Sequence, residues 1–172
     1  MPKDQPDPLI SVVVLEYDEK PVAVDGFVAK TVDGGFSLTH ESIISEEGDA
    51  IVKGYDRRGT VPPHIIVGNK YQSSWKIFVD ESGMLDIDVS YSCQAAKPKG
   101  KLTVVAARQS LSHNLMSTGL TVGEPNRDWH IDNFQSHKLG TINFAKPGIY
   151  EIYLDVEAGK DDELKFQWLW LK

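Results

Sequence analysis

Few residue pairs in this chain have a spacing that suits acid–base catalysis. Asp86 and Asp88 lie two positions apart in an alternating strand pattern, so both carboxylates point to the same, polar face. A glycosidase pair needs about 5–9.5 Å between its carboxyl groups and a cleft that holds the sugar between them. No feature of the sequence marks such a cleft, so we predict no catalytic carboxylate pair.

Other catalytic motifs are also missing from the sequence. Ser110 and Ser112 lie outside any GxSxG pattern, which a hydrolase nucleophile of that class requires. The glycines form no phosphate-binding loop. The five histidines show neither HxH nor HExxH spacing: His40, His64, His113, His130 and His137. We expect no enzyme activity from these residues alone.

One tryptophan follows a polar loop and suits a sugar-binding role. An exposed indole can stack on the C–H face of a pyranose, while nearby polar groups bond to its hydroxyls. Trp129 follows Asn126, Arg127 and Asp128, which carry such groups. Tyr71 precedes the strand of Trp75 and can line the same rim. The alternative is that Trp129 starts a strand and packs into the core.

The elements that must position these residues are short strands separated by turn residues. Trp75–Val79, Leu85–Tyr91 and Ile149–Val156 alternate apolar and polar side chains, which predicts strands with one wet face. In the last strand, Leu164, Phe166, Trp168 and Trp170 share one face, so we predict that both tryptophans, like Trp75, lie mainly in the core. Further strands are predicted at Leu9–Leu15, Phe27–Val32, Phe36–Leu38, Leu102–Ala107 and Leu139–Phe144, and Ser42–Ser45 can extend the strand at Phe36–Leu38.

The whole pattern predicts an all-β fold with about ten strands and no amphipathic helix. Strands at such intervals with Gly/Pro turns are typical of a jelly-roll β-sandwich. We expect residues 1–32 to form a linker with N-terminal strands and residues 33–172 to form the sandwich. The polar stretch Gly48–Pro63 is predicted to be a long surface loop.

Composition limits the partners. The net charge of -7 and the pI near 5.2 argue against nucleic acid and against an anionic membrane surface. No apolar run approaches the roughly 20 residues of a membrane-spanning helix, and the first residues show no signal peptide. Cys93, the single cysteine, is predicted to be a buried thiol.

Three segments resemble galactose-binding-like sandwiches of the family-6 and family-35 carbohydrate-binding modules: Ser37–Gly48, Ser74–Cys93 and Trp129–Leu171. The chain looks most similar to the C-terminal sandwich of bacterial α-L-fucosidases. The stretch Pro6–Asp18 resembles the connector after the catalytic part of those enzymes. The motifs cover mostly core and turn positions, so the resemblance implies a fold more firmly than a ligand.

The resemblance also implies site residues. Related modules place a stacking tryptophan near Trp129 and a polar ligand contact in the loop before the last strand, where this chain has Asp161. Their usual structural metal is calcium, for which Glu41, with Glu46 or Glu47, would be the acidic ligands. Related modules complete that site with an aspartate in the last strand, where this chain has Lys165 and Gln167. We therefore expect no cofactor.

The resemblance implies a non-catalytic accessory module of a secreted or periplasmic glycoside hydrolase. Its partners would be a glycan, with fucose- or galactose-containing glycans the first to test, and a catalytic domain in the parent chain. The rival hypothesis is a purely structural sandwich that packs on a neighbouring domain and binds no ligand. Exposure of Trp129 would separate the two hypotheses.

Overall fold

The computed structural model describes residues 26–53, 62–119 and 132–172. The described residues form ten strands and one 3₁₀ turn: β1 (Phe27–Val28), β2 (Phe36–Leu38), η1 (His40–Ser42), β3 (Ser45–Lys53), β4 (His64–Val79), β5 (Gly83–Cys93), β6 (Lys101–Ala106), β7 (Gln109–Asn114), β8 (Gln135–Phe144), β9 (Gly148–Glu157) and β10 (Leu164–Leu171). They contain no helix that is long and apolar enough to cross a membrane. The all-β prediction is confirmed.

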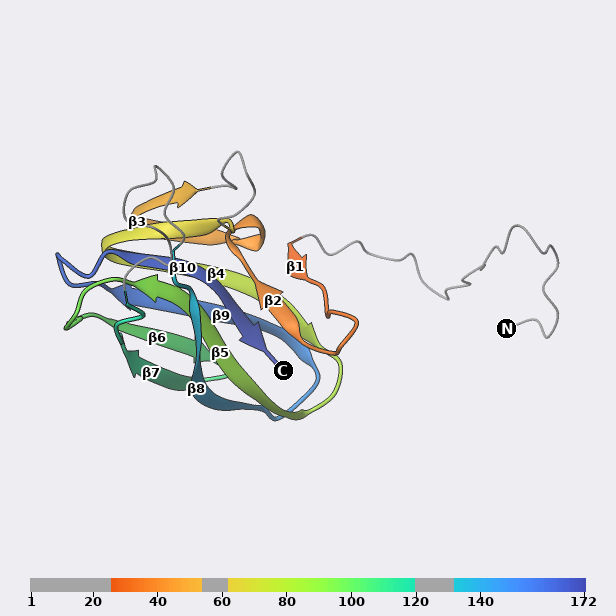
Figure 1. Ribbon diagram of the computed structural model, residues 1–172. Coiled ribbons are helices and arrows are strands. Elements are labelled where there is room, and N and C mark those ends of the chain that lie inside the picture. The colour runs from red at the N-terminus through yellow and green to blue at the C-terminus, as the bar shows by residue number, and fades with distance from the viewer. Residues whose placement is uncertain (1–25, 54–61, 120–131) are drawn as a thin grey trace, which may run out of the picture.

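The strands form the two layers of a jelly-roll sandwich (Figure 1). Hydrogen bonding runs in the order β7-β6-β9-β4-β10-β5-β8, while β1 and β3 pair with β4 and β2 pairs with β10. The first layer contains β7, β6, β9, β4 and β3, and the second contains β2, β10, β5 and β8. The long strand β4 belongs to both layers, because its first residues pair with β10 and its last ten residues pair with β9.

The core lies between the layers and follows the alternation seen in the sequence. Trp75 is fully buried, and its indole Nε1 donates a 2.8 Å hydrogen bond to the Thr39 carbonyl oxygen. The inward positions of β5 and β9 are also buried, as predicted: Ile87, Val89, Tyr91, Ile152, Leu154 and Val156. The buried indole therefore satisfies its one polar group without water.

One prediction about the N-terminal half needs correction. Part of the predicted loop Gly48–Pro63 is strand, because β3 pairs with β4 on both sides of a register shift between Gly48 and Ala50. Among the described residues before position 33, where we expected N-terminal strands, β1 pairs in parallel with β4. The predicted strand Leu9–Leu15 lies outside the described residues.

A β-bulge in β10 corrects a second prediction. Phe166 pairs with Tyr91 but Trp168 pairs with Ser90, so β10 has one extra residue, Gln167, at this point. The extra residue reverses the alternation. Leu169 and Leu171 fill the core in place of the two tryptophans, and Trp168 and Trp170 point to the outer face of the second layer, where both are half-buried.

A histidine pair lies between β7 and β8, the strands at the two ends of the hydrogen-bonded order. These two strands contact each other but are not hydrogen-bonded neighbours. His113 of β7 and His137 of β8 have ring centroids 5.3 Å apart. The ring of His137 also stacks on Tyr91 at 4.5 Å. The Tyr91 hydroxyl lies 2.9 Å from His113 Nε2 and accepts a hydrogen bond from the Met116 amide.

This histidine pair should make the fold sensitive to acid. Burial lowers the pKa of both imidazoles, and the charge of His137 lowers that of His113 further. The residues directly across from them, Leu102 and Val89, carry no charge that could offset protonation. A lowered pKa means that these histidines bind a proton less readily in the folded state than in the unfolded state. Their contribution to stability is therefore complete above the unfolded pKa of about 6.5, and it falls as the pH drops below that value.

We expect the melting temperature to fall from pH 7 to pH 5 in the wild type, and to fall less in the double variant H113Q/H137Q. Thermal melts followed by circular dichroism at intervals of half a pH unit would measure both profiles. Equal slopes for the two proteins would contradict an acid-sensitive pair.

Candidate functional site

The carboxylates of β5 do not form an acid–base pair. Asp86 makes a 2.5 Å ion pair with Lys138 and accepts a 2.7 Å hydrogen bond from Thr141. These hydrogen bonds hold the pKa of Asp86 below its usual range, so the carboxyl stays ionised at neutral pH and is a poor proton donor. Asp88 lies on the same outer face and pairs across the strand with Lys138.

The sequence-predicted sugar site lies largely outside the described residues, which exclude Asn126, Arg127, Asp128 and Trp129. Asp161 is exposed in the loop between β9 and β10, as a ligand contact requires. The predicted rim position of Tyr71 is wrong. The residue lies inside β4, where it is only 1% exposed, and its hydroxyl donates a 3.2 Å hydrogen bond to Glu46. Its ring therefore has no surface on which a sugar can stack.

The three acidic residues considered for calcium do not converge. Adjacent residues of a strand point to opposite faces, so Glu46 and Glu47 of β3 diverge. Glu41 is exposed in η1. Among the described residues, no three His, Cys, Asp or Glu side chains lie where they could hold a metal ion together.

The loop between β9 and β10 is built around a buried carboxylate. Asp162 is 3% exposed and accepts hydrogen bonds from the backbone amides of Lys99 (3.1 Å), Gly100 (2.7 Å) and Gly159 (2.6 Å). The carboxylate thereby fixes this loop to the turn before β6. The same loop borders a hollow of about 520 Å³ lined by Asp49, Ile66, Val67, Gly68, Asn69, Gly159, Lys160 and Glu163.

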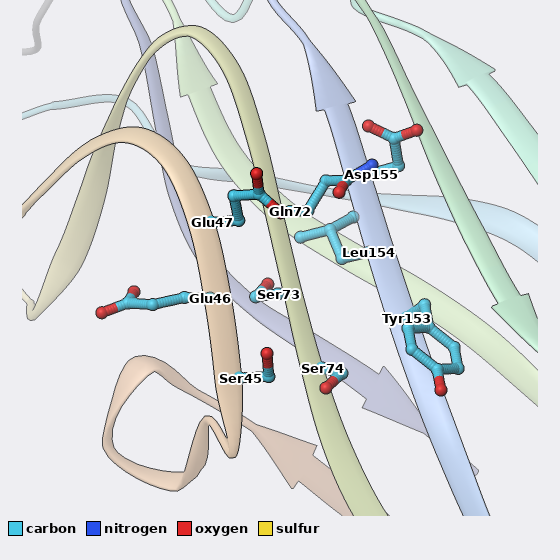
Figure 2. A pocket seen from close by; sticks show the side chains of 9 residues that line it. All are labelled: Ser45, Glu46, Glu47, Gln72, Ser73, Ser74, Tyr153, Leu154 and Asp155. Atoms are coloured by element: carbon cyan, nitrogen blue, oxygen red, sulfur yellow. The ribbon is translucent and has the colours of Figure 1, made fainter.

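A second hollow lies on the outer face of β3, β4 and β9, which we call the Tyr153 face (Figure 2). Its volume is about 190 Å³, and it is lined by Ser45, Glu46, Glu47, Gln72, Ser73, Ser74, Tyr153, Leu154 and Asp155. Polar side chains from three neighbouring strands therefore lie beside one exposed aromatic ring.

Cross-strand pairing arranges these side chains in two parallel rows. Ser45, Ser74 and Tyr153 are direct neighbours in one row, and Glu47, Gln72 and Asp155 are direct neighbours in the other. The rows lie two residues apart along the strands, or about 7 Å. Figure 2 shows Tyr153 and Asp155 on β9 and Gln72 and Ser74 on β4. The first row supplies the aromatic ring, and the second supplies hydrogen-bond donors and acceptors.

The ring of Tyr153 is 47% exposed and remains a neutral phenol. Hydrogen bonding to the Glu151 carboxylate and the nearby negative charge raise the pKa of Tyr153. The same carboxylate accepts a 3.2 Å hydrogen bond from Ser74. A flat ring beside carboxylate, amide and hydroxyl groups suits a neutral ligand rich in hydroxyl groups.

Sequence reasoning overlooked Tyr153, although the signal was present. The alternation of Ile149–Val156 correctly assigns Ile152 and Leu154 to the core. It therefore assigns Tyr153 to the wet face, where its ring is open to a ligand.

Comparisons with known proteins support the fold. No protein-family model matches the chain, and no curated protein matches it. The C-terminal family-6 carbohydrate-binding module of a laminarinase from Zobellia galactanivorans aligns with a TM-score of 0.58 and 16% identity, covering 81% of this chain and 99% of that one. The family-6 module of Cellvibrio mixtus lichenase 5A, solved with cellotriose, aligns at 0.56 and 14%, covering 79% and 95%.

Part of a protein of a different class has the same fold. A mosquito-larvicidal toxin from Bacillus thuringiensis aligns with a TM-score of 0.62 and 9% identity, covering 80% of this chain but 23% of the toxin. At such identities the likeness shows the jelly-roll sandwich and not a ligand. The chemistry of the surface must therefore decide the function.

Proposed function

We propose that this chain is a non-catalytic accessory module of a glycoside hydrolase and binds carbohydrate on the Tyr153 face. The observation that carries the proposal is the exposed ring of Tyr153 beside the row of Glu47, Gln72 and Asp155. Two family-6 modules of glycan-degrading enzymes share the fold along nearly their whole length, which supports the assignment.

The physical argument follows from the arrangement of the two rows. The ring of Tyr153 offers an apolar surface to the C–H groups of a pyranose. Gln72 can donate and accept hydrogen bonds, while Glu47 and Asp155 accept them from sugar hydroxyls. The site is open and solvated, so each hydrogen bond contributes only about 0.5–1.5 kcal/mol. Dissociation constants of about 0.1–1 mM are then expected.

The loop with Trp129 is a further proposed contact, based on the family resemblance. Fucose- and galactose-containing glycans are the first to test, since the sequence looks like the sandwich appended to bacterial α-L-fucosidases. A secreted or periplasmic parent enzyme also follows from that resemblance. The proposal requires no metal ion.

We expect Tyr153→Ala to weaken glycan binding by about two- to twelvefold, because the stacking ring contributes about 0.5–1.5 kcal/mol. Binding would be found on a glycan array and measured by isothermal titration. Tyr153→Phe should retain most of the affinity. Phe78→Ala is the matched control, because Phe78 is 54% exposed on β4 but lies outside the hollow.

The results for these variants distinguish the proposed site from the two alternative hypotheses. Loss of binding in Trp129→Ala but not in Tyr153→Ala would show that the sugar binds at Trp129 and not on the Tyr153 face. If no glycan on the array binds the wild-type chain, the purely structural hypothesis replaces the proposal.

A further inference from the structure

The bulge in β10 creates an aromatic surface on the second layer, on the opposite side of the sandwich from the Tyr153 face. Trp168 pairs with Ser90 and Trp170 pairs with Asp88, and both positions face away from the core. Both indoles are half-buried. The backbones of Trp168 and Trp170 are about 7 Å apart along the strand. The two rings are therefore successive side chains of one face.

The cross-strand neighbours of the tryptophans are polar. One row runs from Ser37 through Trp170 and Asp88 to Lys138, and the next runs from Trp168 through Ser90 to Ser136. We call these two rows the tryptophan face. Ser90 is buried, so the polar groups that a ligand can reach belong to Ser37, Asp88, Lys138 and Ser136. The face thus combines two large rings with hydroxyl, carboxylate and ammonium groups, which together can contact both the C–H faces and the hydroxyls of sugars.

Local contacts fix the bulge and the indole of Trp170. The Ser90 hydroxyl donates a 2.7 Å hydrogen bond to Gln167, the extra residue of the bulge. Trp170 lies over the backbone of Gly35, where an added Cβ would come within 2.6 Å of Cζ2 of the indole. A glycine at this position therefore lets the indole lie close to the sheet. These contacts reduce the entropy that a ligand would otherwise have to remove from the side chains.

The tryptophan face has polar boundaries. Lys165 makes a 2.5 Å ion pair with Asp132 beside Trp168, and Lys138 makes a 2.5 Å ion pair with Asp86 beside Asp88. A large contiguous apolar patch often marks a protein-docking surface. Only the two indoles are large apolar groups in these rows, so a hydroxyl-rich ligand suits this face better.

We propose that the tryptophan face is a second carbohydrate-binding site, which takes two successive pyranose rings of an extended polysaccharide. It is independent of the Tyr153 hollow, because the two faces belong to opposite layers of the sandwich. The inference builds on the proposed function only in the class of ligand. Two sites on opposite faces would let one module contact two polysaccharide chains.

The test uses the full chain and a fixed panel of four hexasaccharides: cellohexaose, laminarihexaose, mannohexaose and xylohexaose. The indole N–H signals of the tryptophans are followed by NMR and assigned with single Trp→Phe variants. We expect at least one hexasaccharide to shift the signals of Trp168 and Trp170 and to leave that of Trp75 unchanged. The corresponding monosaccharide should bind at least about tenfold more weakly, because it covers one ring.

Variants separate this site from the Tyr153 face. W168A/W170A should weaken hexasaccharide binding to the tryptophan face at least tenfold, W168F/W170F should retain it, and Tyr153→Ala should leave it unchanged. Thermal melts confirm that each variant is folded. The inference is wrong if no hexasaccharide shifts the Trp168 and Trp170 signals, or if W168A/W170A binds as wild type. In either case a glycan lost only in Tyr153→Ala would still support the proposed function.

Discussion

Replacing Asp162 by alanine should destabilise the fold by about 3–5 kcal/mol, although the residue lies in a loop. Its carboxylate accepts hydrogen bonds from the amides of Lys99, Gly100 and Gly159. Alanine would leave these amides without partners in a site where Asp162 itself is 3% exposed. Each unsatisfied buried amide costs about 1–3 kcal/mol. Chemical denaturation monitored by tryptophan fluorescence would measure the change.

Two variants serve as controls for this prediction. Asp162→Asn keeps one acceptor oxygen and should lose less stability than Asp162→Ala. Asp161→Ala changes the exposed neighbour in the same loop and should stay within about 0.5 kcal/mol of wild type. A loss below about 1 kcal/mol in Asp162→Ala would show that water replaces the carboxylate and that the loop does not depend on it.

Replacing Trp75 by alanine should cost about 3–5 kcal/mol, since it leaves a large cavity in the core. The side chain is fully buried, lies 6.3 Å from the ring of Phe166 between centroids, and donates a hydrogen bond to Thr39. The variant also leaves the Thr39 carbonyl oxygen without this donor. Denaturant titration would report both the midpoint and the slope of unfolding.

The matched comparison is Trp168→Ala, which removes the same side chain from the outer face. We expect it to cost only about 1 kcal/mol, because the ring is half-buried and no core cavity forms. Equal costs for the two variants would contradict the bulge and return Trp168 to the core.

The bulge marks a limit of prediction from alternation. The pattern of apolar side chains correctly predicts an all-β sandwich and the inward residues of β5 and β9, because a strand repeats every two residues. Trp168 and Trp170 were assigned to the wrong face, since one extra residue, Gln167, reverses the pattern. A bulge has no reliable sequence signal when its residues are ordinary strand formers.

The candidate site was harder to predict than the fold. Tyr71 precedes the Trp75 alternation and was assigned to a loop rim, but β4 is 16 residues long and includes it. Its burial depends on pairing with Gly48 and Val156 from distant parts of the chain. The rows of the Tyr153 face likewise combine β3, β4 and β9. Such long-range pairing cannot be read from local residue patterns.

The double role of β4 has a consequence for the order in which the chain can fold during synthesis. β4 ends at Val79, whereas its partner β9 begins at Gly148, about 70 residues later. At 5–20 residues per second, one edge of this apolar strand waits roughly 3–15 s for its partner to be made. Until then that edge offers unpaired backbone groups to neighbouring nascent chains. Yield during overexpression should therefore depend on translation speed as well as on the stability of the finished protein.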